Sequence, residues 1–137
     1  EGRTDNQTQV KETFESTGRI LLVEDNKLNR KLAEFLLVKA GFKVDIAVTG
    51  KEAVEKYLAD PGRYDIILMD VQMPEMDGKD ASRFIRESGY KDIPIIAMTA
   101  SSMKGDREKC VEAGMNDYIS KPIKKDILYQ VIKKWIS

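Results

Sequence analysis

The sequence contains no histidine, and this absence removes the usual general base of enzymes and the most common ligand of transition metals. It contains a single cysteine, Cys110, so no disulfide can form within the chain. One thiol fits a reducing compartment, and without a histidine to activate it Cys110 is expected to be a small core residue. Any chemistry of this chain must therefore rely on carboxylates, lysines and hydroxyl groups.

Net charge and long apolar runs are absent as well. The 23 basic and 23 acidic residues cancel, so the composition predicts no attraction to nucleic acid or to a membrane surface. No apolar run has the length of a membrane span and no signal-peptide pattern is present, so we expect a cytoplasmic domain without membrane contact. Because the chain starts at Glu1 rather than Met, we expect a fragment or a processed product, and a membrane-anchored parent stays open.

The chain has two parts of different composition. Residues 1–18 are polar, with Val10 and Phe14 as their apolar members, and are predicted to be a linker or tail. From Arg19 onward the apolar content rises abruptly. A chain of 137 residues with 42% hydrophobic content can bury one core, so residues 19–137 are predicted to form one domain.

Short apolar runs indicate strands that are buried on both faces, as in a parallel sheet. Five strands are expected, at residues 20–23, 43–47, 66–69, 94–98 and 117–121. The second alternates between polar and apolar residues, as a short or edge strand does. Pro122 breaks the fifth.

Amphipathic patterns between and after the strands predict five helices. The first should be capped by Asn26 and stop at Gly41. Its apolar stripe is predicted to be Leu28, Leu32, Phe35 and Leu36. The stripes of the later helices are predicted to be Ala53, Val54, Tyr57 and Leu58, then Ala81, Phe84 and Ile85, then Met103, Arg107, Cys110 and Val111, and finally Ile127, Leu128, Val131, Ile132, Trp135 and Ile136.

Strands that alternate with helices predict an α/β fold in which helices cover both faces of a parallel sheet. Right-handed crossovers leave few topologies, and we expect the flavodoxin-like, doubly wound (βα)5 arrangement with strand order 2-1-3-4-5. Its switch point lies between the first and third strands, where open α/β sheets bind ligands. This topology brings Glu24, Asp25 and Asp70 together at the carboxyl ends of the two strands.

Three carboxylates in one crevice repel one another unless a cation lies between them. With oxygen ligands only, we expect a hard cation, and Mg²⁺ fits best because it accepts carboxylates, keeps waters and tolerates a phosphate oxygen. Thr99 and Lys121 end the fourth and fifth strands at the same edge, and their hydroxyl and ammonium groups suit a phosphoryl group. Asp70, which is central, is the candidate nucleophile for an aspartyl phosphate.

Each of these residues also has an ordinary explanation when it is taken alone. Glu24 or Asp25 is most simply an acid that caps a helix. Thr99 is then a strand end, and Lys121 a solvated surface amine. Their shared position at the carboxyl ends of strands favours the functional interpretation.

Beyond its polar tail, the chain resembles the receiver domain of two-component response regulators. Residues 22–26, Leu-Val-Glu-Asp-Asn, resemble the acidic pair after the first strand of that family. Residues 69–74, Met-Asp-Val-Gln-Met-Pro, together with Asp77-Gly78, resemble its phosphoacceptor loop. Thr99-Ala100 is similar to its switch hydroxyl, and residues 117–122, Asp-Tyr-Ile-Ser-Lys-Pro, to its switch aromatic and Lys-Pro pair.

The resemblance implies a role for each acidic position. Asp70 would accept a phosphoryl group from a partner's phosphohistidine. Mg²⁺ would be held by Asp25, Asp70 and the backbone carbonyl of Gln72. Glu24 replaces the commoner Asp and, being longer, would act through a metal-bound water.

The resemblance also implies how the domain responds to phosphorylation and which protein donates the phosphoryl group. Lys121 and Thr99 would assist phosphorylation, and Thr99 with Tyr118 would form a conformational switch. The partner would be the dimerisation and phosphotransfer domain of a histidine kinase or a histidine phosphotransfer protein. The domain, a monomer or weak dimer, would catalyse only its own phosphorylation and dephosphorylation, and whether its parent is a histidine kinase stays open.

Other classes fit less well. A haloacid-dehalogenase-type phosphatase needs a second Asp two residues after its nucleophile, where this chain has Gln72. A flavodoxin shares the topology, but Glu24 and Asp25 would repel the flavin phosphate. A degenerate receiver that serves only for docking need not keep Asp25, Asp70, Thr99 and Lys121 together.

Two kinds of parent protein remain. Asn26, Asn29 and Arg30 resemble the same positions in receivers of hybrid sensor histidine kinases, and residues 1–18 would then be the linker from the kinase core. We therefore expect the C-terminal receiver of such a kinase. A stand-alone response regulator is the alternative.

Overall fold

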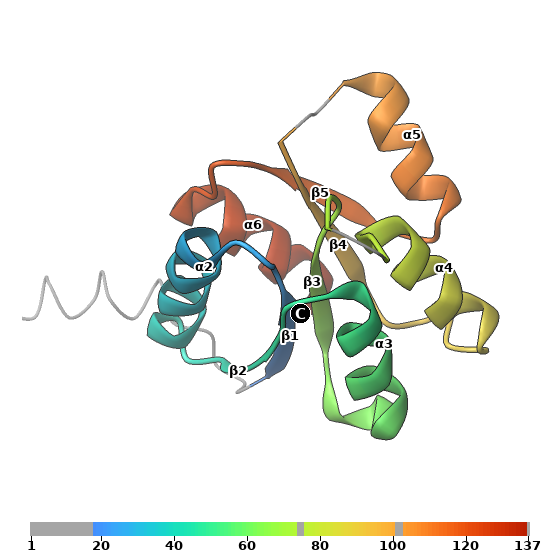
Figure 1. Cartoon of the computed structure of the whole chain (residues 1–137). Coiled ribbons are helices and arrows are strands. Elements are labelled where there is room, and N and C mark those ends of the chain that lie inside the picture. The colour runs from blue at the N-terminus through green and yellow to red at the C-terminus, as the bar shows by residue number, and fades with distance from the viewer. Residues whose placement is uncertain (1–17, 74–75, 101–102, 137) are drawn as a thin grey trace, which may run out of the picture.

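The computed structural model describes residues 18–73, 76–100 and 103–136 (Figure 1). In these ranges five parallel strands form one sheet in the order β2-β1-β3-β4-β5. The strands are β1 (Arg19–Val23), β2 (Lys43–Ala47), β3 (Ile66–Asp70), β4 (Ile95–Thr99) and β5 (Asp117–Ser120). The helices are α2 (Lys27–Lys39), α3 (Gly50–Ala59), the short 3-10 helix η1 (Pro61–Arg63), α4 (Gly78–Glu87), α5 (Lys104–Glu112) and α6 (Lys125–Ile136). The α/β class and the strand order predicted from the sequence are confirmed.

Helices cover both faces of the sheet, with α2 and α6 on one face and α3, α4 and α5 on the other (Figure 1). Alternate residues of a central strand enter the two cores. In β3, Ile67 and Met69 belong to the core formed with α3, α4 and α5, whereas Ile66 and Leu68 belong to the core formed with α2 and α6. Because both faces are buried, β3 is an unbroken apolar run up to its last residue.

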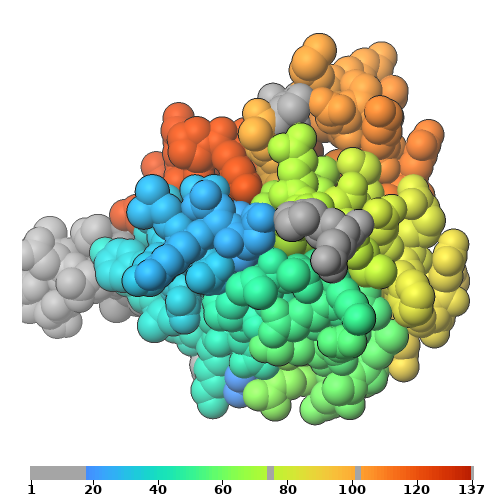
Figure 2. Space-filling model, in the orientation of Figure 1, coloured from blue at the N-terminus to red at the C-terminus, as the bar shows by residue number. Residues whose placement is uncertain are grey.

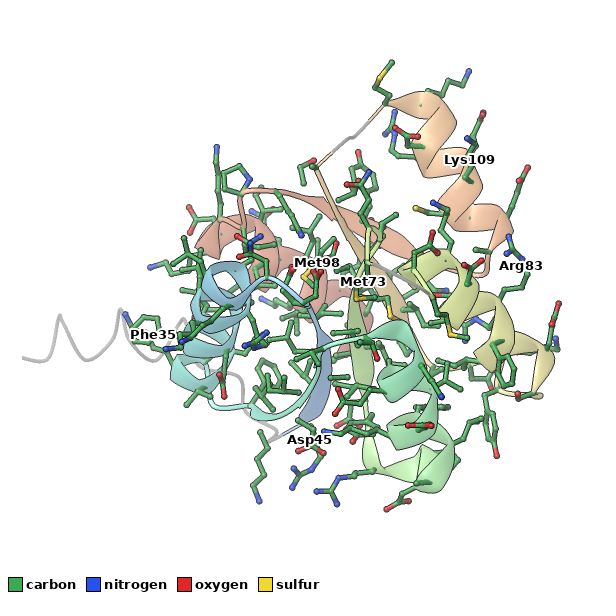
Figure 3. All side chains as sticks on the ribbon, in the orientation of Figure 1. Phe35, Asp45, Met73, Arg83, Met98 and Lys109 are labelled. Atoms are coloured by element: carbon green, nitrogen blue, oxygen red, sulfur yellow. The ribbon has the colours of Figure 1, made fainter. Side chains whose placement is uncertain are left out.

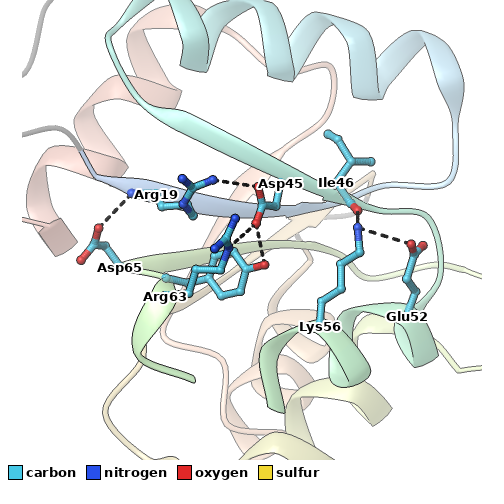
Figure 4. Close-up of polar contacts among 8 residues, drawn as sticks. Arg19, Asp45, Ile46, Glu52, Lys56, Arg63 and Asp65 are labelled. Carbon is cyan, nitrogen blue, oxygen red and sulfur yellow. Dashed lines mark hydrogen bonds and ion pairs between the residues drawn. The ribbon is translucent and has the colours of Figure 1, made fainter. Parts of the chain in front are cut away.

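A group of polar side chains ties the edge strand β2 to its neighbours (Figure 4). Asp45 accepts hydrogen bonds from Arg19 at 3.0 Å, and from Arg63 and Tyr64 at 2.8 Å each. Burial favours the neutral acid, but the hydrogen bonds from Arg63 and Tyr64 and the charges of both arginines hold the pKa of Asp45 below its usual value. The half-buried edge strand β2 is thereby held by the ion pairs of Asp45 as well as by its backbone hydrogen bonds to β1.

The predicted start and stop of the first helix are confirmed. Asn26 caps α2, because its side-chain oxygen accepts from the backbone N–H of Asn29 at 2.9 Å. Thr49 caps α3 in the same way, through the N–H of Glu52 at 3.0 Å. Gly41 follows the end of α2 with a φ of 102°, a conformation that glycine adopts without strain.

The prediction for the inner face of α2 is wrong for three of its four residues. Leu28, Leu32 and Phe35 are exposed to 79%, 41% and 62%, and only Leu36 is buried as expected. The side chains of α2 that pack on the sheet are Ala33, Leu36 and Leu37. The helix carries two apolar stripes, and the one with the small Ala33 faces the sheet because it lets the helix backbone come close.

The same error recurs in the later helices. Residues predicted to face inward but found exposed are Phe84, Met103, Arg107, Val111 and Ile127. The inner faces of these helices are narrower than their apolar patterns suggest. In α5 the single buried residue is Cys110, which is a core residue as expected.

Gly78, the first residue of α4, lies against the end of β3, and this contact generates a prediction. A Cβ at Gly78 would come within 2.2 Å of the Asp70 carbonyl oxygen and 2.8 Å of the Met69 side chain. We expect Gly78→Ala to lower the free energy of unfolding by about 1–3 kcal/mol, because α4 must move away from the strand. Urea unfolding measures the change.

Gly105 provides the matched control, since it also lies in the first turn of a helix but a Cβ there meets nothing within 4 Å. Gly105→Ala should stabilise the fold by up to about 1 kcal/mol. Equal unfolding midpoints for Gly78→Ala and the unsubstituted chain would show that α4 is not pinned to β3.

Candidate functional site

Polar residues gather where the central strands end. Glu24 follows β1 directly, Asp70 is the last residue of β3, and Thr99 is the last residue of β4. Lys121 follows β5, and its backbone N–H donates to the carbonyl of Thr99 at 2.8 Å. The parallel register places these ends at one edge of the sheet, as the sequence predicts.

The ammonium of Lys121 joins two buried acids. Its Nζ lies 2.9 Å from Glu24 Oε1 and 3.1 Å from Asp70 Oδ1. Burial opposes the charged amine, but the hydrogen bonds and charges of Glu24 and Asp70 outweigh it and raise the pKa of Lys121. The peptide bond from Lys121 to Pro122 is cis. Lys121 is therefore a partly buried cation at the centre of the site and not a solvated surface amine.

Glu24 is enclosed and has protein partners for both oxygens. It is 1% exposed, and while Oε1 accepts from Lys121, Oε2 accepts from the backbone N–H of Asn26 at 3.1 Å. The Nη1 of Arg30 also donates to the backbone carbonyl of Glu24 at 3.2 Å. Glu24 thus fixes Lys121 on one side and the start of α2 on the other.

Asp70 is 2% exposed, and its environment favours the protonated form. Burial contributes most, followed by a hydrogen bond with Glu24 and by the negative charge of Glu24, and together they raise the pKa of Asp70 to about 7. Lys121 opposes this rise without cancelling it. The backbone N–H of Gln72 donates to Asp70 Oδ1 at 3.2 Å.

The three acids of this edge are arranged to share a cation. Glu24, Asp25 and Asp70 each offer one carboxylate oxygen, and these oxygens all lie within 4.8 Å of one another. Asp25 is exposed while the other two are buried, so a cation bound here would be reached from solvent. An all-oxygen set with room for water suits a hard divalent cation.

The remaining predicted residues lie close to this cluster. Thr99 is buried at the end of β4, and Tyr118 is partly buried on the adjacent strand β5, paired with Ala97. Gln72 is exposed just after β3. In the loop 71–77 that follows Asp70, Pro74 lies outside the described residues.

Two arginines make contacts that were not among the expectations from the sequence. Arg30 donates to the carbonyls of both Glu24 and Asp25, at 3.2 and 3.3 Å. Arg107 of α5 donates to the hydroxyl of Tyr118 at 2.9 Å. The position of Arg30 four residues after Asn26 is a signal for a contact back to the helix start, but the contact of Arg107 depends on how α5 sits on β5.

None of the helices in the described ranges has both the length and the apolar character that crossing a lipid bilayer demands.

Comparisons with known proteins agree on one family. Residues 20–133 match the response regulator receiver domain. The chain is 46% identical over 124 residues to hybrid signal transduction histidine kinase I of Dictyostelium discoideum, and 42% identical over 118 residues to the aerobic respiration control sensor protein ArcB of Escherichia coli. These alignments cover 86% and 85% of this chain but only 7% and 15% of the two relatives.

A solved structure gives the same picture. The receiver domain of sensor histidine kinase PA1611 from Pseudomonas aeruginosa PAO1 is 43% identical to this chain, with a TM-score of 0.81. The match covers 88% of this chain and 98% of that domain, and that structure contains a magnesium ion coordinated in its active site cleft.

The raised pKa of Asp70 generates a prediction for stability without divalent cations. The folded state holds this proton more tightly than the unfolded chain, where an Asp titrates near pH 4. Folding therefore loses free energy as the pH rises from about 4 to about 7, and Asp70→Asn avoids this loss. We expect Asp70→Asn to be more stable than the unsubstituted chain at pH 8, by on the order of 2 kcal/mol, with a smaller gap at pH 5.

Urea unfolding in the presence of a chelator measures this gap at each pH. Asp92→Asn is the matched control, since Asp92 is an exposed acid in the loop before β4, at the opposite end of that strand from Thr99, and its replacement should not reproduce the stability gain of Asp70→Asn. An Asp70→Asn gap that stays constant between pH 5 and pH 8 would contradict the assigned acidity.

Proposed function

The chain belongs to the response regulator receiver family, and we propose that it accepts a phosphoryl group on Asp70 from a phosphohistidine of a partner protein. The observation that carries this proposal is the buried carboxylate of Asp70, held 3.1 Å from the ammonium of Lys121 beside two further acids. A new bond from an Asp70 oxygen to phosphorus forms as the bond from phosphorus to the imidazole nitrogen breaks, and the imidazole keeps the electron pair.

The three acids support Mg²⁺ as the cofactor. Asp25, Asp70 and the backbone carbonyl of Gln72 would hold the ion, and Glu24 would contribute through a bound water. Bound there, Mg²⁺ offsets the negative charge of the acids and of an incoming phosphoryl group. The magnesium in the cleft of the PA1611 receiver supports the same choice.

Lys121 and Thr99 are proposed to hold the phosphoryl oxygens. Lys121 already contacts Asp70, so a phosphoryl group on Asp70 would form within reach of the ammonium. Glu24 would keep its bond to the N–H of Asn26 when Lys121 turns to the new oxygens. Thr99 and Tyr118 are proposed to form the switch by which phosphorylation changes the surface around β5.

We propose that residues 19–137 are a receiver of a hybrid sensor histidine kinase, with residues 1–18 as the linker. Support comes from the kinases of Dictyostelium discoideum and Escherichia coli, which carry a segment 46% and 42% identical to this one. The cytoplasm, where a kinase has access to ATP, would be its location.

The exposed stripe of α2 supports a docking face for the phosphohistidine partner. Leu28, Leu32 and Phe35 lie on one side of the helix, and Phe35 extends away from the strands (Figure 3). The helix forms open surface in the space-filling view, and it starts two residues after Asp25 (Figure 2). A partner bound to this stripe would therefore reach the carboxylates of Glu24, Asp25 and Asp70.

The charges around this stripe indicate the chemistry of the partner. Lys27, Lys31 and Lys39 are exposed on the same helix, and the ammonium of Lys39 lies 6.0 Å from the centre of the Phe35 ring. An apolar helix face with an acidic rim would complement both features. A helix that carries the phosphohistidine fits this description.

The first test is the site and metal dependence of phosphorylation. A small phosphodonor with Mg²⁺ should add one phosphoryl group to the protein, labile to alkali, and Asp70→Asn should take up none, because the acceptor oxygen is lost. Mass spectrometry and radiolabelling measure the uptake. Asp25→Ala should raise the Mg²⁺ concentration needed at least about ten-fold, because it removes an anionic ligand.

Asp65→Asn is the matched control. Asp65 is an exposed acid directly before the start of β3, the strand that ends in Asp70, and its side chain accepts a hydrogen bond from the backbone N–H of Arg19. It should be phosphorylated like the unsubstituted chain. Undiminished uptake by Asp70→Asn would refute the acceptor.

The second test separates docking from chemistry. Phe35→Glu should slow phosphotransfer from a phosphorylated histidine phosphotransfer protein at least about ten-fold, because it puts a charge into an apolar contact. Its uptake from a small phosphodonor should be unchanged. Phe84→Glu, on the exposed side of α4, is the control and should leave both rates unchanged. If Phe35→Glu alters neither rate, the partner docks elsewhere.

A further inference from the structure

Helix α5 is held to the body of the domain by few side chains. It lies at the periphery of the helical layer, beyond α4 (Figure 1). Cys110 is its single buried residue, and its first turn has no side-chain cap at Met103. A helix with so little buried surface depends on individual contacts for its position.

Arg107 makes one such contact, with the ring of Tyr118 on β5. Its Nη1 donates to the Tyr118 hydroxyl at 2.9 Å, and its guanidinium carbon lies 5.2 Å from the centre of the ring. The same side chain therefore holds Tyr118 by a hydrogen bond and by a cation–π contact. Both interactions exist only while the ring keeps its present position.

The two residues line a groove between α5 and β5. The groove has a volume of about 730 Å³, and Arg107, Val111, Met115 and Tyr118 are among the residues that line it. Tyr118 lies beside Ala97 in the sheet, two residues before Thr99 at the end of β4. Tyr118 thus lines the groove and packs against the core that contains Ala97 of β4, the strand that ends in Thr99.

We propose that Arg107 is a positioning residue that holds Tyr118 in the unphosphorylated arrangement and thereby sets the resting balance of the receiver. This inference rests on the proposed function, in which Asp70 is phosphorylated and Thr99 and Tyr118 form the switch. Movement of the ring toward Thr99 breaks both contacts with Arg107. Arg107 therefore stabilises the resting state and not the phosphorylated one.

The consequence follows from the linkage between conformation and ligand affinity. A ligand that binds only the minor, active state has an apparent affinity proportional to the population of that state. Loss of Arg107 removes stabilisation from the resting state alone, so the active population rises. The affinity for a phosphoryl mimic at Asp70 should rise by the same factor.

The experiment is a titration with beryllofluoride and Mg²⁺, followed by NMR on the Tyr118 ring and on the backbone of α5 and β5. Arg107→Ala should bind the mimic about five-fold more tightly than the unsubstituted protein, which corresponds to about 1 kcal/mol. Its Tyr118 signals before the mimic is added should already be shifted toward the bound position. Arg107→Lys keeps the charge without the planar guanidinium and should lie between the two.

Two controls separate this role from a general effect on the helix. Lys109→Ala removes a positive charge from the exposed surface of the same helix and should leave the affinity unchanged (Figure 3). In a Tyr118→Leu background, where the ring and its hydroxyl are gone, Arg107→Ala should have no further effect. A melting curve checks that each variant is folded.

The results distinguish the two levels of the proposal. If the unsubstituted protein does not respond to beryllofluoride, the proposed function fails and this inference with it. If the unsubstituted protein responds but Arg107→Ala binds the mimic equally well or more weakly, Arg107 does not hold the resting state. An effect of Arg107→Ala that persists in Tyr118→Leu would likewise overturn it.

Discussion

The site depends on the ammonium of Lys121, which lies between two carboxylates that are almost fully enclosed by protein. Buried acids this close would otherwise destabilise the folded chain, since burial and mutual repulsion both disfavour their charged forms. Lys121 reaches Glu24 at 2.9 Å and Asp70 at 3.1 Å, and its backbone is fixed by the carbonyl of Thr99. The ends of β1, β3, β4 and β5 are thus joined through one residue.

Lys121 does not fully offset the cost of ionising Asp70, and the cost that remains is useful for function. The pKa of Asp70 stays raised to about 7 because burial and Glu24 outweigh Lys121. An acid that is costly to ionise gains from any cation, and a carboxylate that has lost its proton is a better nucleophile. Binding of a divalent ion would therefore favour the form of Asp70 that attacks phosphorus. The strain of crowded acids and the proposed need for Mg²⁺ have the same physical origin.

The sequence predicts the sheet and the positions of the site residues well, because both depend on local patterns. Ile66 to Met69 cannot be an exposed strand, and Asp70 must follow it at the edge of a parallel sheet. The orientation of the helices is harder to predict. In α2 the stripe with Leu28, Leu32 and Phe35 is as apolar as the one that packs, and only the geometry of the sheet selects the side with Ala33. The contact of Arg107 with Tyr118 is likewise set by the position of α5, which no local pattern encodes.

The two surfaces proposed for binding and for response lie on opposite faces of the sheet, and the central strand connects them. α2 packs on one core and α5 on the other, so the two surfaces share no core. β3 contributes alternate side chains to both cores, and its last residue is Asp70. A group added to Asp70 lies beside Glu24 and Asp25, which precede α2, and beside β4, which ends in Thr99 and pairs with the strand that carries Tyr118. A close-packed sheet transmits such a change because its side chains have no free volume into which to relax. The loosely held α5 is then the element that can move, since its displacement disrupts the fewest buried contacts.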